Sequence, residues 1–546
     1  MAGPPAGQGP FPRFHPGGVA GLLVLLALLF PPGQLGAADG PRARDAAAQD
    51  FFTGPVQVWE LTLPEASRQA LRESPRDYAP ARVRIGSEVF EEVGVHLKGS
   101  AGSKRSVDDR PSMTLKFNRY RPGRRAFGLE KLHLNNSVQD GSYLNQNLAS
   151  RVYRAAGIPL TRSTHALLRV NGQDQGVYVV VESYDADYVR RNFPGAGWRR
   201  SNLYDCGFIA DIDRNLQRDA GEGPADWADL KRLREAVNQP LKLRKAALEQ
   251  VLDVDRFRTL VAIQMTLDDW DGYVRNRNNY RICFPAGDGR AVFLPSGLDQ
   301  LLRHPEAPVR DAWTGRVAQA LFEIPGESLQ LRARMRELSQ SWLSEAWLTN
   351  QLGQLQARLD AAVAARPEGM REPQFPDRWN QMTRVRQRLQ VVARELADWP
   401  DPLPPLAPGT RLQPAPWTLL VQTGKGRGET TALAGVAGKV LHLVAEAEGT
   451  RASFRAVVTV PAGEYRWHGR AKTRGVEPFE DQFGRGAALR MTGSTAAQRL
   501  EGDTDWTTLQ FEFEQREDGP VELIVELRAN RGEAWFDLGS LALEAR

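Results

Sequence analysis

The sequence predicts an α+β protein in which a mixed N-terminal part is followed by an all-β sandwich. Three observations support this. Between residues 56 and 182, short segments alternate apolar with polar side chains, as half-buried strands do. Helical periodicity then dominates, with interruptions, from 226 to 396. Beyond a proline-rich stretch, strand patterns return without helices, which is typical of a sandwich, here expected as a jelly roll. Strands first and helices later fit a two-lobed enzyme with its cleft between the lobes.

Length and charge narrow the classes of function. A chain of 546 residues is too long for one compact core, so two or more domains are expected. The 71 Lys and Arg side chains are nearly balanced by 66 Asp and Glu, and the two signs are interspersed. A nucleic-acid partner would require a clustered basic face, so none is expected.

The first 38 residues have the features of a signal peptide. Arg13 precedes an apolar run at 21–30, and small residues follow at 36–38. The run is too short to span a bilayer as a helix, and no other run is long enough. We therefore expect a soluble chain beginning near Ala38, without a stable membrane span. It would be secreted, periplasmic or held at the cell surface; a retained N-terminal anchor is the alternative. Residues 39–50, rich in Ala and Arg, are expected to be a disordered linker.

Two cysteines remain for an oxidising compartment, Cys206 and Cys283. One disulfide could form, but two cysteines cannot make a disulfide scaffold. Cys283 lies in a strand-like run and could instead be a small buried apolar residue. No paired Cys or His spacing favours a zinc site.

The most informative segment is 268–280, together with 293–300. It places Asp271 five residues before Asn276, and Asp299 follows a short strand. In phosphoryl-transfer sites one carboxylate accepts a hydroxyl proton, while an asparagine and a second acid hold metal ions on a triphosphate. The alternative is a solvated acidic loop with an Asx-rich turn. The acids at 268 and 269 leave the identity of the base open, and the spacing to Asn276 favours Asp271.

A loop of small residues at 98–103 separates two predicted strands. Its backbone N–H groups could approach phosphates closely, although such hairpins are common. A helix is expected at 142–156, and Asn171-Gly172 predicts a hairpin between the next two strands. The acidic segment 211–222 resembles a calcium loop, but Leu216 stands where the turn needs glycine, so a solvated loop is favoured.

The proline-rich stretch at 400–416 contains seven prolines and is expected to be an extended linker. In the sandwich that follows, Trp467, Trp506 and Trp535 could form a platform for stacking sugars. Trp467, between Arg466 and His468, is the one most expected to face outward. The alternative is that all three fill the core, as large aromatic side chains usually do.

Several segments together resemble the CotH family of spore-coat and secreted bacterial proteins. The matching segments follow the family order over about residues 55–395: 95–100, 127–136, 155–159, 170–182, 201–204, and the two acidic segments. The resemblance implies a divergent, two-lobed protein-kinase-like fold. The domains expected on this basis are a signal peptide at 1–38, a linker at 39–50, a kinase-like domain at 51–397, a linker at 398–416, and a β-sandwich at 417–546.

The resemblance also implies roles for individual residues, with ATP and Mg²⁺ or Mn²⁺ as cofactors. Asp271 would be the catalytic base. The metal ligands would come from Asn276, Asn279 and Asp299. The nucleotide would be bound by the covering loop Lys98, Gly99 and Ser100, by Lys116 on the next strand, and near Glu182 at the adenine-binding hinge.

The chain departs from the family pattern at two places. Gly297 stands in a segment where relatives commonly carry an additional acid before Asp299. On the helix expected at 142–156, relatives often carry a glutamate that could pair with the strand lysine. Gln146 or Asn147 stands there instead, and an amide cannot form a charge-assisted pair with Lys116.

The function expected from the resemblance is an exported atypical protein kinase. It would transfer the γ-phosphoryl group of ATP to Ser or Thr of an envelope or secreted protein. The alternative is a catalytically degenerate surface or matrix protein that keeps the kinase fold and binds a protein or glycan through its C-terminal sandwich.

Overall fold

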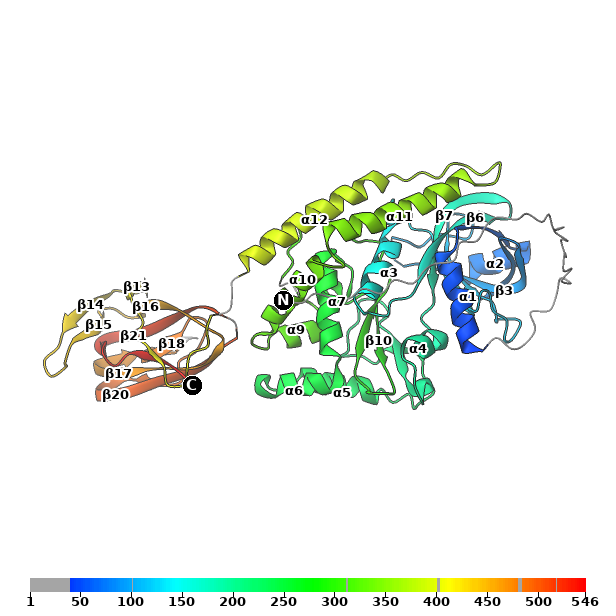
Figure 1. Cartoon of the computed structure of the whole chain (residues 1–546). Helices are drawn as coiled ribbons and strands as arrows, with labels where there is room; N and C mark the ends of the chain where they lie inside the picture. Colours follow the sequence, from blue (N-terminus) through cyan, green and yellow to red (C-terminus); the bar gives the residue numbers. More distant parts are fainter. Residues whose placement is uncertain (1–39, 101, 311–312, 400–402, 480–483, 517) are drawn as a thin grey trace, which may run out of the picture.

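The computed structural model describes residues 40–100, 102–310, 313–399, 403–479, 484–516 and 518–546 (Figure 1). The expected signal peptide at 1–38 lies outside these residues. The described chain is a mixed α+β protein, as predicted. None of its described helices combines the length and apolar character needed to cross a membrane.

The helices of the described chain lie before residue 400. Their bounds are α1 Pro41–Thr53, α2 Glu65–Glu73, α3 Asn145–Ala155, α4 Ala186–Asn192, α5 Ala228–Val237, α6 Leu241–Val251, α7 Val254–Thr266, α8 Tyr273–Asn276, α9 Arg316–Phe322, α10 Glu327–Ser339, α11 Glu345–Ala364 and α12 Arg378–Asp398, with a short 3-10 turn η1 at Trp198–Arg200.

The N-terminal strands form a closed barrel in the order β1-β2-β3-β4-β5-β7-β6. The strands are β1 Gln57–Thr62, β2 Ala79–Ile85, β3 Glu88–Lys98, β4 Ser112–Lys116, β5 Lys131–Asn135, β6 Ser163–Val170 and β7 Gln173–Glu182. The barrel closes because β1 pairs parallel with β6, while the other pairs are antiparallel. Alternating apolar residues fill its interior, including Trp59, Leu115 and Val180. The predicted Asn171-Gly172 hairpin joins β6 to β7.

A second core joins the helices to a small sheet of order β11-β10-β8-β9. Its strands are β8 Asn202–Asp205, β9 Gln217–Ala220, β10 Tyr280–Phe284 and β11 Val292–Pro295. Helix α7 packs against β11 and α10, and α12 lies along α11 (Figure 1). The loop between α7 and β10 therefore carries Asp271, and the end of β11 leads to Asp299.

The C-terminal strands make a third core of their own. They are β12 Arg411–Leu412, β13 Thr418–Thr423, β14 Gly426–Ala432, β15 Lys439–Ala445, β16 Thr450–Val460, β17 Gly463–Pro478, β18 Gly486–Met491, β19 Arg499–Leu500, β20 Gly502–Gln515, β21 Gly519–Asp537 and β22 Ala542–Ala545. In Figure 1 these strands gather at one end of the molecule, beyond α12.

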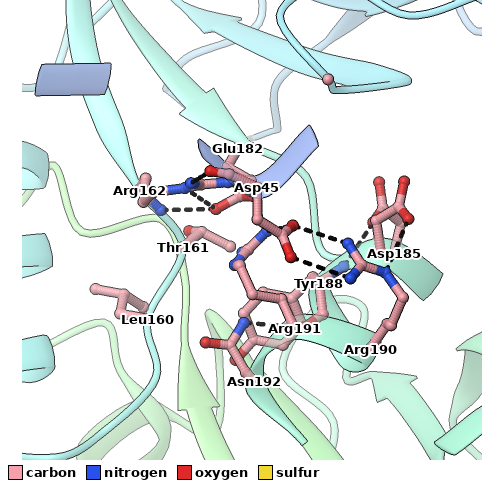
Figure 2. Close-up of polar contacts among 12 residues, drawn as sticks. Asp45, Leu160, Thr161, Arg162, Glu182, Asp185, Tyr188, Arg190, Arg191 and Asn192 are labelled. Carbon is pink, nitrogen blue, oxygen red and sulfur yellow. Dashed lines mark hydrogen bonds and ion pairs between the residues drawn. The ribbon is translucent and has the colours of Figure 1, made fainter. Parts of the chain in front are cut away.

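Residues 41–53 correct the prediction of a disordered linker at 39–50, because they form helix α1. Pro41 occupies the first turn, where its missing N–H costs nothing. Phe51 and Phe52 at the other end are buried in the barrel core. Asp45 receives two hydrogen bonds from Arg190, at 2.8 and 3.0 Å (Figure 2). The Ala- and Arg-rich composition of 39–50 suggested disorder because the residues that hold α1, Arg190 and the barrel core, are distant in the sequence.

The expected linker at 398–416 is also shorter than predicted. Arg411 and Leu412 form β12, which pairs with β22 at the edge of the sheet. Leu406 and Leu412 pack against the third core. The Leu403 amide N–H also donates to Asp518. The sandwich therefore includes residues from 403 onward, and its prolines flank an edge strand, where proline is tolerated.

Three expectations about individual side chains are decided by their burial and contacts. Trp467, expected to face outward, is fully buried in the third core and stacks on Trp417. Its strand alternates, and the polar neighbours Arg466 and His468 take the outer positions instead. Cys206 and Cys283 are both free and buried, so they are not bonded to each other. Within the calcium-like segment, Asp211 is buried and accepts from Arg316 N and Tyr273 Oη rather than being solvated.

Candidate active site

Asp271 is surrounded by asparagine amides. Asn276 Nδ2 and Asn278 Nδ2 donate to Asp271 Oδ1 at 2.5 and 3.1 Å. Asn279 Nδ2 donates to the other oxygen, Oδ2, at 2.8 Å. Asp271 itself is half-buried. These donors fix the orientation of the carboxylate.

The structure distinguishes Asp271 from the two acids that precede it. Asp268 is buried, and it accepts from Arg275 Nη1 at 2.8 Å and from the His304 amide N–H at 2.6 Å. Asp269 is also buried and accepts from Gln264 Nε2 at 2.8 Å. Burial, reinforced by the neighbouring charge of Asp271, raises the pKa of Asp269 to about 7. Of the three acids, Asp271 is therefore the one available to a reactant.

Asp299 lies within electrostatic range of Asp271 and Lys98. Burial and the nearby carboxylate of Asp140 raise the pKa of Asp299 to about 6. A small polar cavity of about 150 Å³ opens beside Asp299. Its lining is almost entirely polar: Gln139, Asp140, Asn145, Asp299, Gln300, Leu301, Arg303, Asp377 and Arg384.

The backbone around Asp299 is held by the first turn of α3. Asn145 Nδ2 donates to the Asp299 carbonyl oxygen at 3.0 Å. Gln146 Oε1 accepts from the Leu298 amide N–H at 3.1 Å. Asn147, the third amide, bonds His165 instead. Of the two amides at the position where the resemblance implied a glutamate, Gln146 binds the acidic segment and Asn147 binds a histidine, and among the described residues neither is hydrogen-bonded to a lysine.

Lys98 is a cation whose charge acts on Asp299. It ends β3, and its Nζ donates to Asn135 Oδ1 at 2.7 Å. Burial, with the charge of Arg281, lowers the pKa of Lys98 to about 8, while the Asp299 carboxylate opposes that shift. Lys116, which the resemblance implied as the phosphate-binding cation, lies opposite Lys131 and Gly94 at the far end of β4. No ion pair of Lys116 is present among the described residues.

The loop after Lys98 keeps the backbone shape that glycine allows. Gly99 has φ +110°, and a Cβ there would lie 3.1 Å from the Ser103 carbonyl oxygen. The Gly99 carbonyl accepts from Arg76 Nη2 at 2.6 Å, and the Ser100 N–H donates to Ser103 Oγ at 3.1 Å. Residue 101 lies outside the described chain. The described part is thus a tight turn beside Lys98.

Glu182 is placed at the end of β7, as predicted from the hairpin, but its carboxylate is already paired (Figure 2). Arg162 donates to it through Nε at 3.0 Å and Nη2 at 2.6 Å. Arg191 Nη1 lies 2.7 Å from the same carboxylate. The structure therefore does not bring the Glu182 side chain to the group formed by Asp271, Asp299 and Lys98.

The oxygen-rich residues fit a magnesium or manganese ion. Mg²⁺ binds through one or two carboxylates plus phosphate and water oxygens. Because the amide nitrogens of Asn276 and Asn279 donate to Asp271, their carbonyl oxygens remain for a metal. Asp299 supplies a carboxylate nearby. Among the described residues no cluster of three or more His, Cys, Asp or Glu suits a metal, so the ion would depend on amide and phosphate oxygens.

Sequence reasoning missed the support that Asn135 and Asn145 give to the site, and it singled out Gln146 without its contact to the Asp299 segment. Each is an amide that binds either Lys98 or the backbone around Asp299. The sequence signal for these residues was the large number of Asn and Gln side chains between 135 and 147, more than are needed to cap the N-terminus of a helix. A buried amide requires a partner, but the sequence does not say which one.

Comparisons with known proteins identify the family of the chain. The family described as "CotH kinase protein" matches residues 95–399. The "Inner spore coat protein H" of Bacillus subtilis (strain 168) is 21% identical over 165 residues, which are 28% of this chain and 46% of that protein. The chain thus matches less than half the length of that curated relative.

Two solved structures show weak likeness. The Helicobacter pylori proinflammatory kinase CtkA gives a TM-score of 0.23 at 10% identity, covering 53% of this chain and 94% of that one. A structure of TmCBM61 in complex with beta-1,4-galactotriose gives 0.19 at 15% identity, covering 24% and 90%. TM-scores this low support no inference about fold or ligand. The family match, in contrast, covers more than half of the chain and includes both acidic segments, so the protein belongs to the CotH kinase family.

Proposed function

We propose that this protein is an exported kinase that transfers the γ-phosphoryl group of ATP to a Ser or Thr hydroxyl of an envelope or secreted protein. One observation carries the proposal. A half-buried carboxylate, Asp271, is held by three amides within electrostatic range of a second acid, Asp299, on which the charge of Lys98 also acts. Those are the groups that phosphoryl transfer requires.

In this proposal Asp271 orients the acceptor hydroxyl and takes its proton. A bond forms between the hydroxyl oxygen and the γ-phosphorus, the bond from that phosphorus to the β–γ bridging oxygen breaks, and ADP leaves. The three asparagine amides keep the carboxylate fixed, so little reorganisation is needed during the transfer.

Lys98 contacts the phosphates, with Gly99 and Ser100 covering them. Lys98 replaces Lys116 as the leading candidate, because its charge interacts with Asp299 and it is anchored by Asn135. The adenine ring lies near the end of β7 in this proposal. Main-chain groups after Glu182 would bind it, because the Glu182 carboxylate is already paired with Arg162 and Arg191.

Asn276, Asn279 and Asp299 would hold Mg²⁺ or Mn²⁺. When bound, the ion neutralises charge on the phosphates of ATP. The protein's own part is to keep these oxygen donors at one edge of the small sheet, where β10 begins and β11 ends.

The direct test uses the mature chain with labelled ATP, Mg²⁺ or Mn²⁺ and a generic protein acceptor. Asp271→Ala and Asp299→Ala should each reduce the transfer rate by orders of magnitude. Asp213→Ala serves as control, because Asp213 is exposed and lies outside the site. Transfer that survives both site substitutions would refute the assignment.

A second candidate function is glycan or protein binding by the sandwich on a catalytically degenerate kinase fold. It is favoured by a row of side chains across one face. His442 stacks on Trp535 at 4.7 Å, and Lys472 Nζ lies 5.1 Å from the Trp535 ring and 5.5 Å from the Trp506 ring. Trp506 is half-buried and could stack on a sugar.

Thermal shift separates the two candidates. A ligand at a hundredfold its dissociation constant stabilises a protein by about 2.7 kcal/mol. A response to Mg–ATP supports the kinase. A flat response with every metal, together with glycan binding that Trp506→Ala abolishes, supports the binding protein.

A further inference from the structure

Helix α12 buries two polar side chains that its periodicity would not require. Gln381 and Arg388 are both fully inaccessible to solvent. Their neighbours Arg386 and Gln387 on the same helix are exposed. A buried polar side chain is tolerated only when its hydrogen bonds are made, so the partners of these two residues indicate what α12 does.

Arg388 bonds four carbonyl oxygens in two segments. Its Nε donates to Thr266 O at 3.0 Å, and Nη2 donates to Met265 O. These carbonyls end α7, where the last turn lacks partners within the helix. Its Nη1 donates to Pro305 O at 2.9 Å and to Ala307 O.

Those two segments flank the two acids of the site. Met265 and Thr266 lead directly into the loop that carries Asp271, and 305–307 follows the turn that carries Asp299. Arg388 therefore joins the supports of the two acidic segments through one rigid guanidinium group.

Gln381 makes a second connection to the same place. Its Nε2 donates to Asn145 Oδ1, and Asn145 Nδ2 donates to the Asp299 carbonyl oxygen at 3.0 Å. Arg384, one turn along α12, lines the polar cavity beside Asp299. Helix α12 is thus linked to the Asp299 backbone through Gln381 and Asn145, and its Arg384 lines the cavity beside Asp299.

Direct bonds also cross between the two segments. Leu302 N donates to Leu267 O at 2.9 Å, and Asp268 accepts from His304 N at 2.6 Å. The two segments are consequently joined both by these direct bonds and through Arg388 of α12.

We propose that Gln381 and Arg388 are positioning residues: α12 sets the distance and orientation between Asp271 and Asp299 and thereby the affinity for a metal–nucleotide complex. Neither residue touches a reactant. The part of the proposal that concerns nucleotide rests on the proposed function, whereas the part that concerns the two segments does not.

Hydrogen–deuterium exchange on the full mature chain tests the structural part. Arg388→Met should increase amide exchange in 267–272 and 302–309 without affecting the C-terminal sandwich. Arg386→Met is the matched control, since Arg386 is exposed and pairs with Glu345 on the surface. Increased exchange that spreads evenly through the chain, or none in these segments, would overturn the proposal.

Binding of Mg–ATP by calorimetry tests the functional part. Loss of a residue that supports metal ligands typically weakens binding by about tenfold to a hundredfold. We expect that range for Arg388→Met, partial recovery for Arg388→Lys, and wild-type affinity for Arg386→Met. In steady-state assays KM for ATP should rise at temperatures where the variant remains folded.

A milder pair of variants covers the case in which Arg388→Met fails to fold. Gln381→Leu should increase exchange around Asp299 and weaken Mg–ATP binding, while Gln387→Leu should do neither. Unchanged exchange and affinity in Gln381→Leu would overturn the proposal. If the wild-type chain binds no Mg–ATP, the proposed function fails, and the exchange results still decide whether α12 holds the two segments.

Discussion

Gly297 lies against the carboxamide of Asn279, and a Cβ at position 297 would approach Asn279 Oδ1 to 2.7 Å. Gly297 also has φ +60°, which side-chain-bearing residues rarely adopt. This residue looked like a departure from the family at the second acidic segment. In the structure it makes room for a proposed metal ligand.

Gly297→Ala should therefore reduce metal–nucleotide binding at least about tenfold, because Asn279 must move from its place beside Asp271. Gly289→Ala is the matched control. It has a similar φ of +70°, but a Cβ there meets only Arg232 Nη2 at 4.0 Å. Calorimetry with Mg–ATP should show the loss in the first variant alone, and equal affinities would contradict the role given to Gly297.

Asp269 should make stability fall as the pH rises. Its pKa in the folded chain, about 7, exceeds the ordinary aspartate value of 3.8, so the folded state holds a proton that the unfolded state has released. Stability is greatest below the unfolded value and declines as pH rises through about 7.

Asp269→Asn removes this cost, because the amide stays neutral and can still accept from Gln264. At about pH 8 the variant should be more stable than wild type by a few kcal/mol, each pKa unit corresponding to about 1.4 kcal/mol. Thermal melts at about pH 5 and pH 8 measure this. A gain that is the same at both pH values, or that appears also in Asp213→Asn, would count against it.

Asp45→Ala should destabilise the barrel end of the chain. It removes the shorter ion pair of Arg190, whose side chain is 17% exposed and which keeps a longer contact of 3.5 Å with Asp187. Because this ion pair is intermediate between exposed and fully buried, its loss should lower the free energy of unfolding by about 1–3 kcal/mol. Glu222→Ala breaks the exposed pair with Arg199 and should cost less than about 1 kcal/mol. Chemical denaturation compares the two, and equal effects would mean that α1 is not docked through Asp45.

We propose that the C-terminal part folds independently, with its boundary moved to residue 403. Two exposed ion pairs, Lys242–Glu464 and Arg516–Glu323, link it to the helical part. A fragment of residues 403–546 should show a cooperative melt, and 417–546 should melt lower because it lacks β12. Limited proteolysis should release a soluble fragment that begins close to 403. If 403–546 is unfolded by circular dichroism, the division is wrong.

Local patterns predicted the elements well where neighbours in sequence decide the structure. The β6–β7 hairpin, α3, α12 and the texture of the sandwich follow from turn residues and periodicity. Predictions failed where distant partners decide. Helix α1 depends on Arg190 and on the barrel core, β12 depends on β22, and Trp467 is placed by its strand's register.

The candidate site divides in the same way. Asp271 and its asparagines are close in sequence, so their spacing was informative. The support of Asp299 comes from α3 and α12, more than 80 residues away along the chain on either side. Contacts between residues so far apart produce no periodic pattern in the sequence. The preference for Lys98 over Lys116 likewise depends on the three-dimensional positions of β3 and β4.

The closed barrel has a consequence for how partners can be recruited. A sheet with a free edge has unpaired N–H and C=O groups to which an extended peptide can bind. A closed barrel has no such edge. Each of the seven barrel strands has two neighbours, so a protein partner cannot add a strand to the barrel. It must instead be recognised through side chains and loops. In the described chain the strands with a free edge belong to the two open sheets: β9 and β11 end the small sheet beside the acids, and outer strands such as β13 and β20 belong to the C-terminal sheet beyond the linker.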